Sequence, residues 1–135
     1  DGAFRRDFPG GWPGDAVNAF TGQGLNARQL EAQAFLRKLL TWRKQQPVVH
    51  EGSWRHYAPE QGTYVYFRRL GERTVMVVFN KNRSEAVLEL ARFAALVQPG
   101  QPAREVLSDR ALTLPAQLRV PARSVWVLEL APAAP

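Results

Sequence analysis

Apolar side chains follow a helical period over about twenty residues after position 26. They recur three or four positions apart, so that they share one helix face: Ala32, Phe35, Leu36, Leu39, Leu40 and Trp42. Asn26 suits the start of this helix, and Gln29 stands at the spacing of a capping box. Pro47 ends it, because proline lacks an N–H and disfavours helical geometry at the preceding residue. The pattern predicts one long amphipathic helix that has no helical partner downstream.

After Pro47 the pattern changes to short runs rich in β-branched and aromatic residues, separated by turn residues. Residues 73–80 are apolar on both faces, as expected of a central strand, and Gly71-Glu72 joins them to the preceding strand in a hairpin. We expect strands over residues 53–58, 63–70, 73–80, 86–90, 104–107, 111–114, 117–120 and 124–130. The prediction is a mainly β fold, an antiparallel β-sandwich of Greek-key type with about eight strands.

The first 24 residues have neither period. They open with D-G-A-F-R-R-D-F-P-G-G-W-P-G-D, which is too aromatic for a disordered arm and too rich in glycine and proline for a helix or strand. Such a run indicates an ordered loop, and long ordered loops in compact domains usually belong to binding or catalytic surfaces.

Composition narrows the classes of function. The formal charge of +6 suggests a polyanion partner, but the excess of basic residues is the same in residues 1–47 and 48–135, and acids are interspersed. Arg37, Lys38, Arg43 and Lys44 fall in the last turns of the helix, where cations complement its dipole. No apolar run is long enough for a membrane span, and the absence of cysteine excludes disulfides and thiolate metal sites. We therefore expect no nucleic-acid or membrane partner.

The opening run carries a family resemblance. Its pattern D-x-x-x-R-x-D-F-P-G-G-W-x-G-D-x-x-N-A-F-T-G resembles the segment after the eighth barrel strand in neopullulanase- and cyclomaltodextrinase-like members of the α-amylase superfamily. L-R-K-L-L-T-W-R-K-Q-Q-P-V-V-H-E-G is similar to the helix-to-sandwich junction of that family. H-Y-A-P-E-Q-G-T-Y-V-Y-F-R-R and V-M-V-V-F-N-K-N are similar to its first hairpin, and S-V-W-V-L-E-L to its closing strand.

This resemblance implies a division of the chain and an activity for a longer parent. Residues 1–47 would be the end of the catalytic (β/α)8 barrel, with its substrate-side loop and last helix, and residues 48–135 the C-terminal β-sandwich. The chain would be the C-terminal fragment of an enzyme that hydrolyses α-glucosidic bonds in maltodextrins, cyclodextrins or pullulan. Its partners would be the rest of the barrel and, through the parent, α-glucan oligosaccharides. Homodimer formation, the compartment and the preferred bond stay open.

The resemblance also implies which residues touch substrate. In related enzymes an Asp and an Arg four residues apart, just after the eighth strand, contact sugar hydroxyls, and by position these are Asp1 and Arg5. The alternative is a structural ion pair that holds the loop. The catalytic carboxylates of the family lie in motifs that are missing here: Arg5-Arg6-Asp7 has neither the glycine nor the preceding strand of the nucleophile motif. We expect no catalytic residue, cofactor or metal in this chain, which would serve a structural role.

Other candidates have simpler readings. Asp7 and Asp15 are typical of turn caps, while Phe8 and Trp12 either anchor the loop or stack on a sugar. His50 and His56 lack a third ligand at a metal-site spacing, which favours structural roles. An aromatic cluster in the first strands suggests either a glucan platform or sandwich core: Trp54, Tyr57, Tyr64, Tyr66 and Phe67. The platform reading makes the chain a free-standing glucan-binding β-sandwich module, the alternative to an enzyme fragment.

Overall fold

The fold was analysed in a computed structural model that describes residues 7–132. The described part of the chain forms two compact units, one up to Lys38 and one from Leu39 onward. Asp1 and Arg5 lie outside the described residues. The elements in chain order are α1 (Ala27–Lys44), α2 (Pro47–His50), β1 (Ser53–Glu60), β2 (Thr63–Leu70), β3 (Arg73–Asn80), β4 (Ala86–Glu89), the 3-10 helix η1 (Leu90–Phe93), β5 (Pro102–Glu105), β6 (Arg110–Thr113), β7 (Gln117–Val120) and β8 (Ser124–Leu130).

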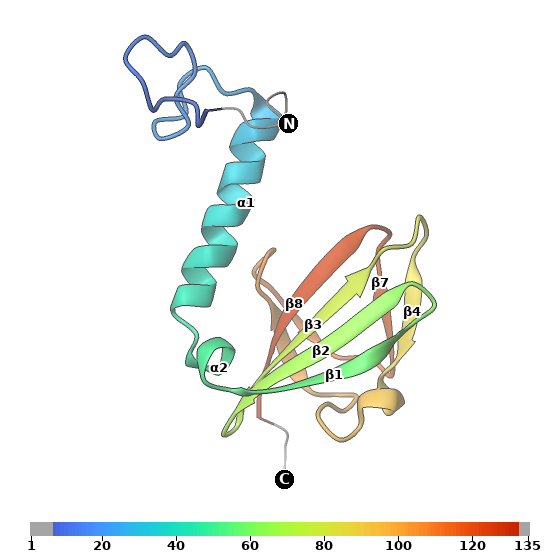
Figure 1. Cartoon of the computed structure of the whole chain (residues 1–135). Coiled ribbons are helices and arrows are strands. Elements are labelled where there is room, and N and C mark those ends of the chain that lie inside the picture. The colour runs from blue at the N-terminus through green and yellow to red at the C-terminus, as the bar shows by residue number, and fades with distance from the viewer. Residues whose placement is uncertain (1–6, 133–135) are drawn as a thin grey trace. The chain divides into compact units, whose positions relative to one another are not determined.

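The expected antiparallel β-sandwich of eight strands is confirmed (Figure 1). Six strands form one sheet in the order β1-β2-β3-β8-β5-β6, and β4 and β7 form a second, two-stranded sheet. All the strand pairs are antiparallel. The last strand, β8, lies between β3 and β5, so the end of the chain completes the large sheet.

Side chains alternate between the two faces of the large sheet and form two cores. The inner core faces the small sheet, and Met76, Val78 and Leu128 are fully buried in it together with Leu90 and Phe93. The outer core lies on the opposite face of the same sheet and consists of Val48, Val75, Val77, Val106 and Val127. Leu39 and Trp42 from the end of α1 pack against this outer core, as does Val49 of α2. The end of α1 and α2 therefore cover part of the outer face.

The start of α1 confirms the predicted capping box. The Asn26 side-chain oxygen accepts the Gln29 N–H at 3.0 Å, and the Gln29 side chain accepts the Asn26 N–H at 2.9 Å. No side chain of α1 is buried. Leu30, Phe35, Leu36 and Leu40 are each more than two-fifths exposed, so the apolar stripe read from the sequence is open on this chain.

The prediction that the chain turns to β structure directly after Pro47 was wrong for residues 48–50, which are helical. After a turn Pro47 occupies the start of the short helix α2, where its missing N–H costs nothing. Val48 of this helix is buried in the outer core. At Gly52, which leads into β1, a Cβ would collide with the carbonyls of Val48 and Arg69, so only glycine permits this close approach.

Strand β5 begins and ends two residues before its predicted bounds. The carboxylate of its last residue, Glu105, accepts the N–H groups of Leu107 and Ser108, at 3.1 and 2.7 Å. Those amides are therefore used in a turn and not in the sheet. A side chain that accepts hydrogen bonds from the backbone of the next residues leaves no trace in the hydrophobic pattern. The strand was therefore predicted two residues too late.

Candidate functional site

The opening loop is held by two short polar side chains that bind its backbone. The Asp15 carboxylate accepts the N–H groups of Gly10 and Trp12, at 2.8 and 3.2 Å. Asn18 does the same for Phe20 and Thr21, at 2.9 and 3.1 Å. Asp15 therefore has the turn-capping geometry typical of aspartate in loops.

The aromatic residues of this loop face outward. Phe8, Trp12 and Phe20 are 61%, 67% and 71% exposed, and Phe8 meets Phe20 edge-to-face with ring centroids 5.2 Å apart. Gln33 of α1 donates to the Ala19 carbonyl at 2.9 Å, which ties the loop to the helix that follows it. The described residues of the loop thus present three large aromatic side chains on a hydrogen-bonded frame.

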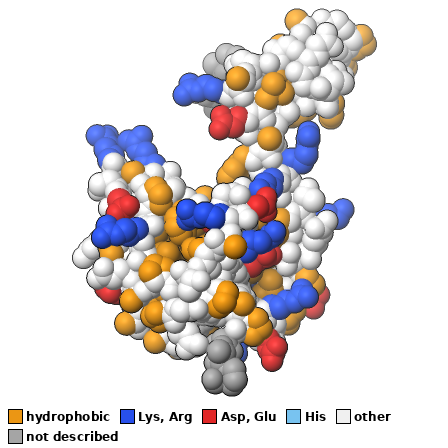
Figure 2. Space-filling model, turned by 180° about the vertical axis from the view of Figure 1, so that it is seen from behind, with side chains coloured by type: hydrophobic (Ala, Val, Ile, Leu, Met, Phe, Trp, Pro, Cys, Tyr) orange, Lys and Arg blue, Asp and Glu red, His pale blue; other side chains and the backbone are white. Residues whose placement is uncertain are grey.

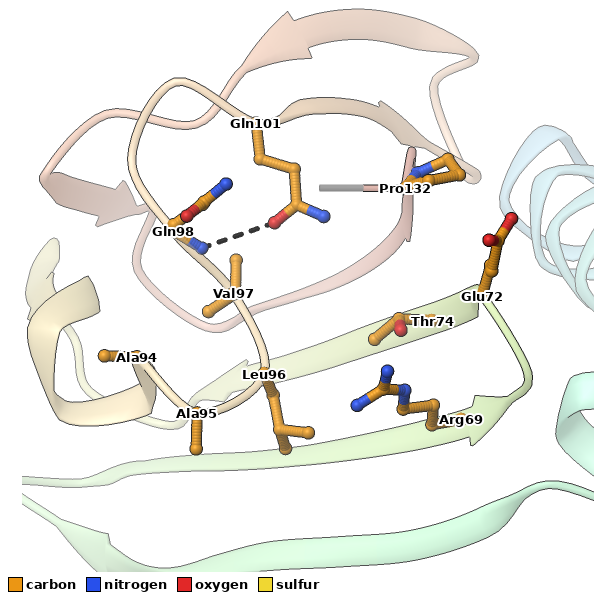
Figure 3. A pocket seen from close by; sticks show the side chains of 10 residues that line it. All are labelled: Arg69, Glu72, Thr74, Ala94, Ala95, Leu96, Val97, Gln98, Gln101 and Pro132. Carbon is orange, nitrogen blue, oxygen red and sulfur yellow. Dashed lines mark hydrogen bonds between the residues drawn. The ribbon is translucent and has the colours of Figure 1, made fainter. Parts of the chain in front are cut away.

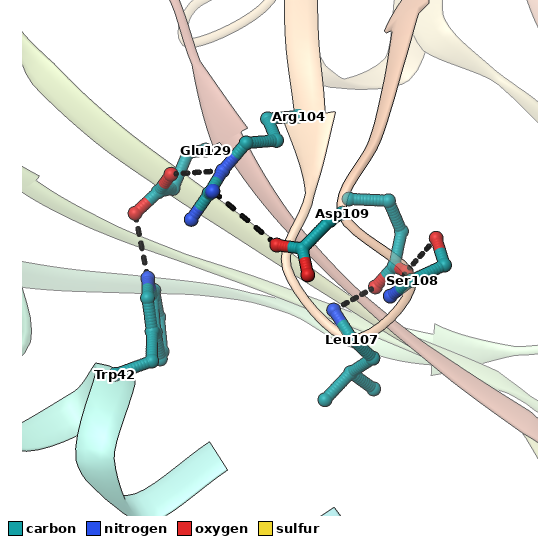
Figure 4. A network of polar contacts seen from close by, with 7 residues as sticks. Trp42, Arg104, Leu107, Ser108, Asp109 and Glu129 are labelled. Carbon is teal, nitrogen blue, oxygen red and sulfur yellow. Dashed lines mark hydrogen bonds and ion pairs between the residues drawn. The ribbon is translucent and has the colours of Figure 1, made fainter. Parts of the chain in front are cut away.

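A second polar cluster joins the end of α1 to the large sheet (Figure 4). The Trp42 indole N–H donates to Oε1 of Glu129 on β8 at 2.6 Å. Oε2 of the same carboxylate pairs with Arg104 on β5 at 3.0 Å, and Arg104 also pairs with Asp109 at 3.3 Å. Each carboxylate oxygen of Glu129 therefore has a hydrogen-bond partner, and the cluster connects the end of α1 to the large sheet.

Glu105, beside this cluster, is a buried carboxylate with several donors around it. Besides Leu107 and Ser108 N–H it accepts the Ser108 hydroxyl at 2.6 Å and the Val127 N–H at 3.3 Å. Burial by itself would raise the pKa of Glu105, but the hydrogen bonds from Ser108, Leu107 and Val127 stabilise the ionised form and the net shift is downward. The carboxylate is therefore held ionised as a structural acceptor.

A cavity of about 330 Å³ opens beside the turn between β2 and β3 (Figure 3). Polar side chains of Arg69, Glu72, Thr74 and Gln101 line it together with the loop at residues 94–98. Gln101 is already engaged, since it accepts the Gln98 N–H at 3.3 Å and donates to the Ala131 carbonyl at 2.5 Å. Within the described chain no buried side-chain nitrogen or oxygen lacks a partner, so this cavity has no unpaired buried group that would mark a ligand.

The two histidines lie on different elements. A ring nitrogen of His50, in α2, lies 2.9 Å from the Arg43 carbonyl, and His56, in β1, stacks on Trp54 with centroids 4.6 Å apart. Among the described residues, no group of three histidine or acidic side chains is placed to hold a metal ion. Nor does any described helix have the length and apolarity to cross a membrane.

The aromatic cluster of the first strands divides between the two faces of the sheet. Tyr57 and Phe67 belong to the inner side, where both contact Phe93 at centroid distances of 4.8 and 5.9 Å. Trp54 and Tyr64 lie on the outer face, as does Tyr66, and they are joined there by His56 and Phe79. The platform and core readings of this cluster each fit only some of its members.

Sequence reasoning missed His56 and Phe79 as members of the outer group. Alternation along β1 places His56 on the same face as Trp54, and this could have been read from the sequence. Phe79 joins only through the register, which pairs it with Tyr64 across β2 and β3. Because β3 is apolar on both faces, its sequence alone does not show which of its residues lie on the same face as the tyrosines of β2.

Charged side chains do not gather into one site. In the view of Figure 2, lysine and arginine side chains lie at separate places on the surface with acidic side chains among them, and hydrophobic side chains show between them. Arg92, Arg104 and Arg119 pair with Glu60, Glu129 and Glu85. This pattern is typical of a solvated surface.

A comparison with protein families finds a match for the sandwich. A family model described as "Cyclo-malto-dextrinase C-terminal domain" matches residues 54–129, more than half of the chain. The match begins in β1 and ends in β8, so it covers the sandwich.

Solved structures show the same fold. AmyP, crystallised with maltose, matches with a TM-score of 0.72 and 15% identity over 90% of this chain and 25% of its own. The α-amylase of Geobacillus thermoleovorans, complexed with acarbose, matches with a TM-score of 0.62 and 15% identity over 83% of this chain and 26% of its own. An Anoxybacillus α-amylase matches with a TM-score of 0.61 and 15% identity over 84% of this chain and 25% of its own. The chain spans about a quarter of the length of these structures.

Proposed function

The chain belongs to the family of cyclo-malto-dextrinase C-terminal domains, and from this premise we propose that it is the C-terminal part of a neopullulanase- or cyclomaltodextrinase-like enzyme. The parent enzyme hydrolyses α-glucosidic bonds in maltodextrins, cyclodextrins or pullulan by the retaining reaction of its superfamily. The family match over residues 54–129 is the observation that carries the proposal. The open apolar stripe of α1 supports it, because a barrel helix needs a barrel to pack on.

In this proposal the chain contributes structure and no chemistry. Residues 1–47 complete the barrel with its substrate-side loop and last helix, and residues 48–135 form the sandwich that covers apolar surface of the barrel. Retaining hydrolysis needs two carboxyl groups about 5 Å apart on either side of the bond. Three of the described carboxylates are already engaged in structural hydrogen bonds: Glu105 and Asp15 accept from backbone amides, and Glu129 accepts from Trp42 and Arg104.

The activity is tested on the polypeptide encoded by the reading frame that contains this sequence. We expect it to release reducing ends from maltodextrin, β-cyclodextrin or pullulan, with products that first appear in the α-anomeric form. The 135-residue chain alone is the matched control and should release none. A longer polypeptide that hydrolyses none of the three substrates would contradict the proposal. Hydrolysis by the 135-residue chain would contradict it as well.

Asp1 and Arg5 are proposed to contact sugar hydroxyls in that enzyme. A carboxylate accepts and a guanidinium donates, so the two together match a pair of neighbouring hydroxyls. Replacing Arg5 by alanine should lower kcat/KM on maltodextrin about tenfold or more, as expected when a charged hydrogen bond to substrate is lost. Arg6→Ala is the matched control and should leave kcat/KM unchanged. Equal effects of the two substitutions would contradict a specific contact of Arg5 with the substrate.

A further inference from the structure

The small sheet has an open edge that borders a groove. Among the described strands, β4 pairs with β7 on one side and with none on the other. A groove of about 500 Å³ is lined by residues 84–89, which include β4, and by Glu60, Gln61 and Thr63 of the β1–β2 hairpin. Figure 1 shows β4 and the β1–β2 turn at the same end of the sandwich. A third strand added beside β4 would therefore enter this groove.

Two residues of β4 direct their backbone groups toward the open edge. On a strand the N–H and C=O groups of alternate residues point to opposite edges. Leu90, directly after β4, donates its N–H to the Ala116 carbonyl at 3.0 Å, on the β7 side. Leu88 has the same parity and pairs with β7, which leaves the N–H and C=O groups of Val87 and Glu89 on the open edge. Within the described chain no hydrogen bond from another residue reaches these four groups.

The spacing of these groups matches an extended polypeptide. Val87 and Glu89 are two residues apart, which corresponds to about 6.8 Å along an antiparallel strand. An extended segment repeats its N–H and C=O groups with the same period, so it can pair with all four groups when it adds to a sheet edge.

Other classes of ligand fit the groove less well. Phe93 is the aromatic residue of the lining and is 0% exposed, so it offers no open ring face on which a sugar could stack. Among the described residues no three histidine or acidic side chains are placed to hold a metal ion. Val87 is 44% exposed and provides apolar surface that a neighbouring strand would cover.

The charged groups of the groove favour a basic partner. Of the described lining residues, Glu60, Glu85 and Glu89 carry carboxylates and Arg92 carries a guanidinium. Glu60 pairs with Arg92 at 3.0 Å, and Glu85 pairs with Arg119 at 2.8 Å. Glu89, on the open edge itself, has an amide partner but no cation in the part of the chain that the structure describes. A lysine or arginine beside Glu89 would supply that cation.

The β1–β2 turn at the groove is held by its own contacts. The Asn82 side chain donates to the Gln61 carbonyl at 2.7 Å, and a Cβ at Gly62 would collide with the same side chain. Arg92 of η1 donates to the Ala58 carbonyl of β1 at 2.7 Å. A groove with fixed sides loses little conformational freedom when it binds, which favours affinity.

We propose that the open edge of β4 binds an extended basic polypeptide segment, which adds a third strand to the small sheet. The backbone groups of Val87 and Glu89 supply the pairing, and the Glu89 carboxylate favours lysine or arginine in the segment. The site lies wholly within the sandwich, so the proposal does not depend on the proposed function.

Peptide binding by the 135-residue chain tests this proposal. The probe is a seven-residue peptide of alternating lysine and valine, and the same peptide with glutamate in place of lysine is its control. With the basic peptide, the amides of Val87 and Glu89 should exchange with deuterium tenfold more slowly or less, because they become hydrogen-bonded. Amides of β1 and β6, the edge strands of the large sheet, should keep their rates, and the glutamate peptide should have no effect.

Substitutions in β4 separate the backbone pairing from the charge. Val87→Pro removes an N–H from the open edge without removing a bond to β7, and should weaken binding of the basic peptide about tenfold. Val87→Thr keeps the N–H and the branched shape, and as the matched control should bind like the unsubstituted chain. Glu89→Gln keeps the backbone but removes the charge, so it should weaken binding at low salt and have little effect at high salt.

Four results would overturn the proposal. The first is an unchanged exchange rate at Val87 and Glu89 with millimolar basic peptide, and the second is equal binding of the two peptides. The third is undiminished binding by Val87→Pro; if that variant does not fold, the exchange rates of the unsubstituted chain decide. The fourth is slower exchange of these two amides with maltoheptaose and not with the peptide, which would make the groove a glucan site.

Discussion

Glu105 is a buried acid whose side chain holds several backbone groups in place. Its carboxylate accepts three backbone N–H groups and one hydroxyl, and thereby closes the turn between β5 and β6 and fixes that turn to β8 through Val127. A buried carboxylate without such donors would oppose folding, because burial disfavours the charged form. The donors reverse that balance, which is why the pKa falls despite the burial.

Glu105→Gln keeps the size of the side chain but replaces an acceptor oxygen by an NH2 group that cannot accept. We expect the free energy of unfolding at pH 7 to fall by about 2 kcal/mol, the range of hydrogen bonds to a charged group. Urea unfolding of the chain and the variant measures this loss. Ser84→Ala, at an exposed position with no side-chain bond in the described structure, is the control and should cost less than about 0.5 kcal/mol.

Because the pKa of Glu105 is lowered, we expect its contribution to stability to depend on pH. Because the folded state holds the ionised form, the contribution of Glu105 is full above the ordinary carboxyl pKa of 4.5 and is lost as the pH falls through the lower folded-state value. The difference in unfolding free energy between wild type and Glu105→Gln should therefore shrink as the pH falls from above 4.5 through the lower folded-state pKa. A difference that stays constant as the pH is lowered until the protein unfolds would contradict the role given to the carboxylate.

Trp42 is the second residue whose contact can be tested alone. Trp42→Phe keeps an aromatic ring on the outer core but removes the N–H that donates to Glu129. We expect amides in the last turn of α1 to exchange about tenfold faster with deuterium, which corresponds to about 1.4 kcal/mol. Amides in β2 should exchange faster only as far as the lower overall stability of the variant requires. Uniform acceleration across the sandwich would mean that the bond does not specifically hold the helix end.

At the scale of elements, local patterns predicted what local physics determines. Asn26 and Gln29 marked the start of α1 because their bonds span only three residues. The strands at 63–70, 73–80, 117–120 and 124–130 match the structure because alternation and turn residues define them. The position of β8 between β3 and β5 could not be read, since that pairing joins residues far apart in sequence.

The misses have physical causes of the same kind. The helix at Pro47 was missed because proline both ends one helix and suits the first turn of the next. Strand β5 was misplaced because Glu105 redirects the following amides. Of the predicted site, Asp1 and Arg5 lie outside the described residues. The aromatic residues on the outer face of the large sheet could be grouped only once the register of β1, β2 and β3 was known.

The open stripe of α1 predicts how the isolated chain behaves. Leu36 and Leu40 are 52% and 56% exposed, and apolar stripes of this kind associate in water. We expect the 135-residue chain to self-associate as its concentration rises, and Leu36→Lys with Leu40→Lys to reduce this association. Ala34→Lys with Thr41→Lys adds the same charge at exposed positions off the stripe and is the matched control. Sedimentation velocity measures all three, and a wild-type chain that stays monomeric would contradict the expectation.

At the scale of the whole molecule, the chain combines a self-sufficient core with surfaces that are incomplete on their own. The inner core is closed by the small sheet and η1, and its largest side chains are fully buried. The apolar stripe of α1 is open, and so are Trp54 and Phe79 on the outer face of the large sheet, and both surfaces are explained if this chain covers and completes a barrel. A soluble module that evolved to stand alone would have little reason to keep two such surfaces exposed.

The most direct test of this account is the thermal stability of α-glucan hydrolysis with and without the sandwich. The longer polypeptide and a version that lacks residues 48–135 would be heated in steps and assayed for residual release of reducing ends from maltodextrin. The account predicts that the shortened protein is insoluble or loses activity at a clearly lower temperature, because apolar barrel surface becomes exposed. A soluble shortened enzyme with the same activity and the same inactivation temperature would contradict the structural role proposed for this chain.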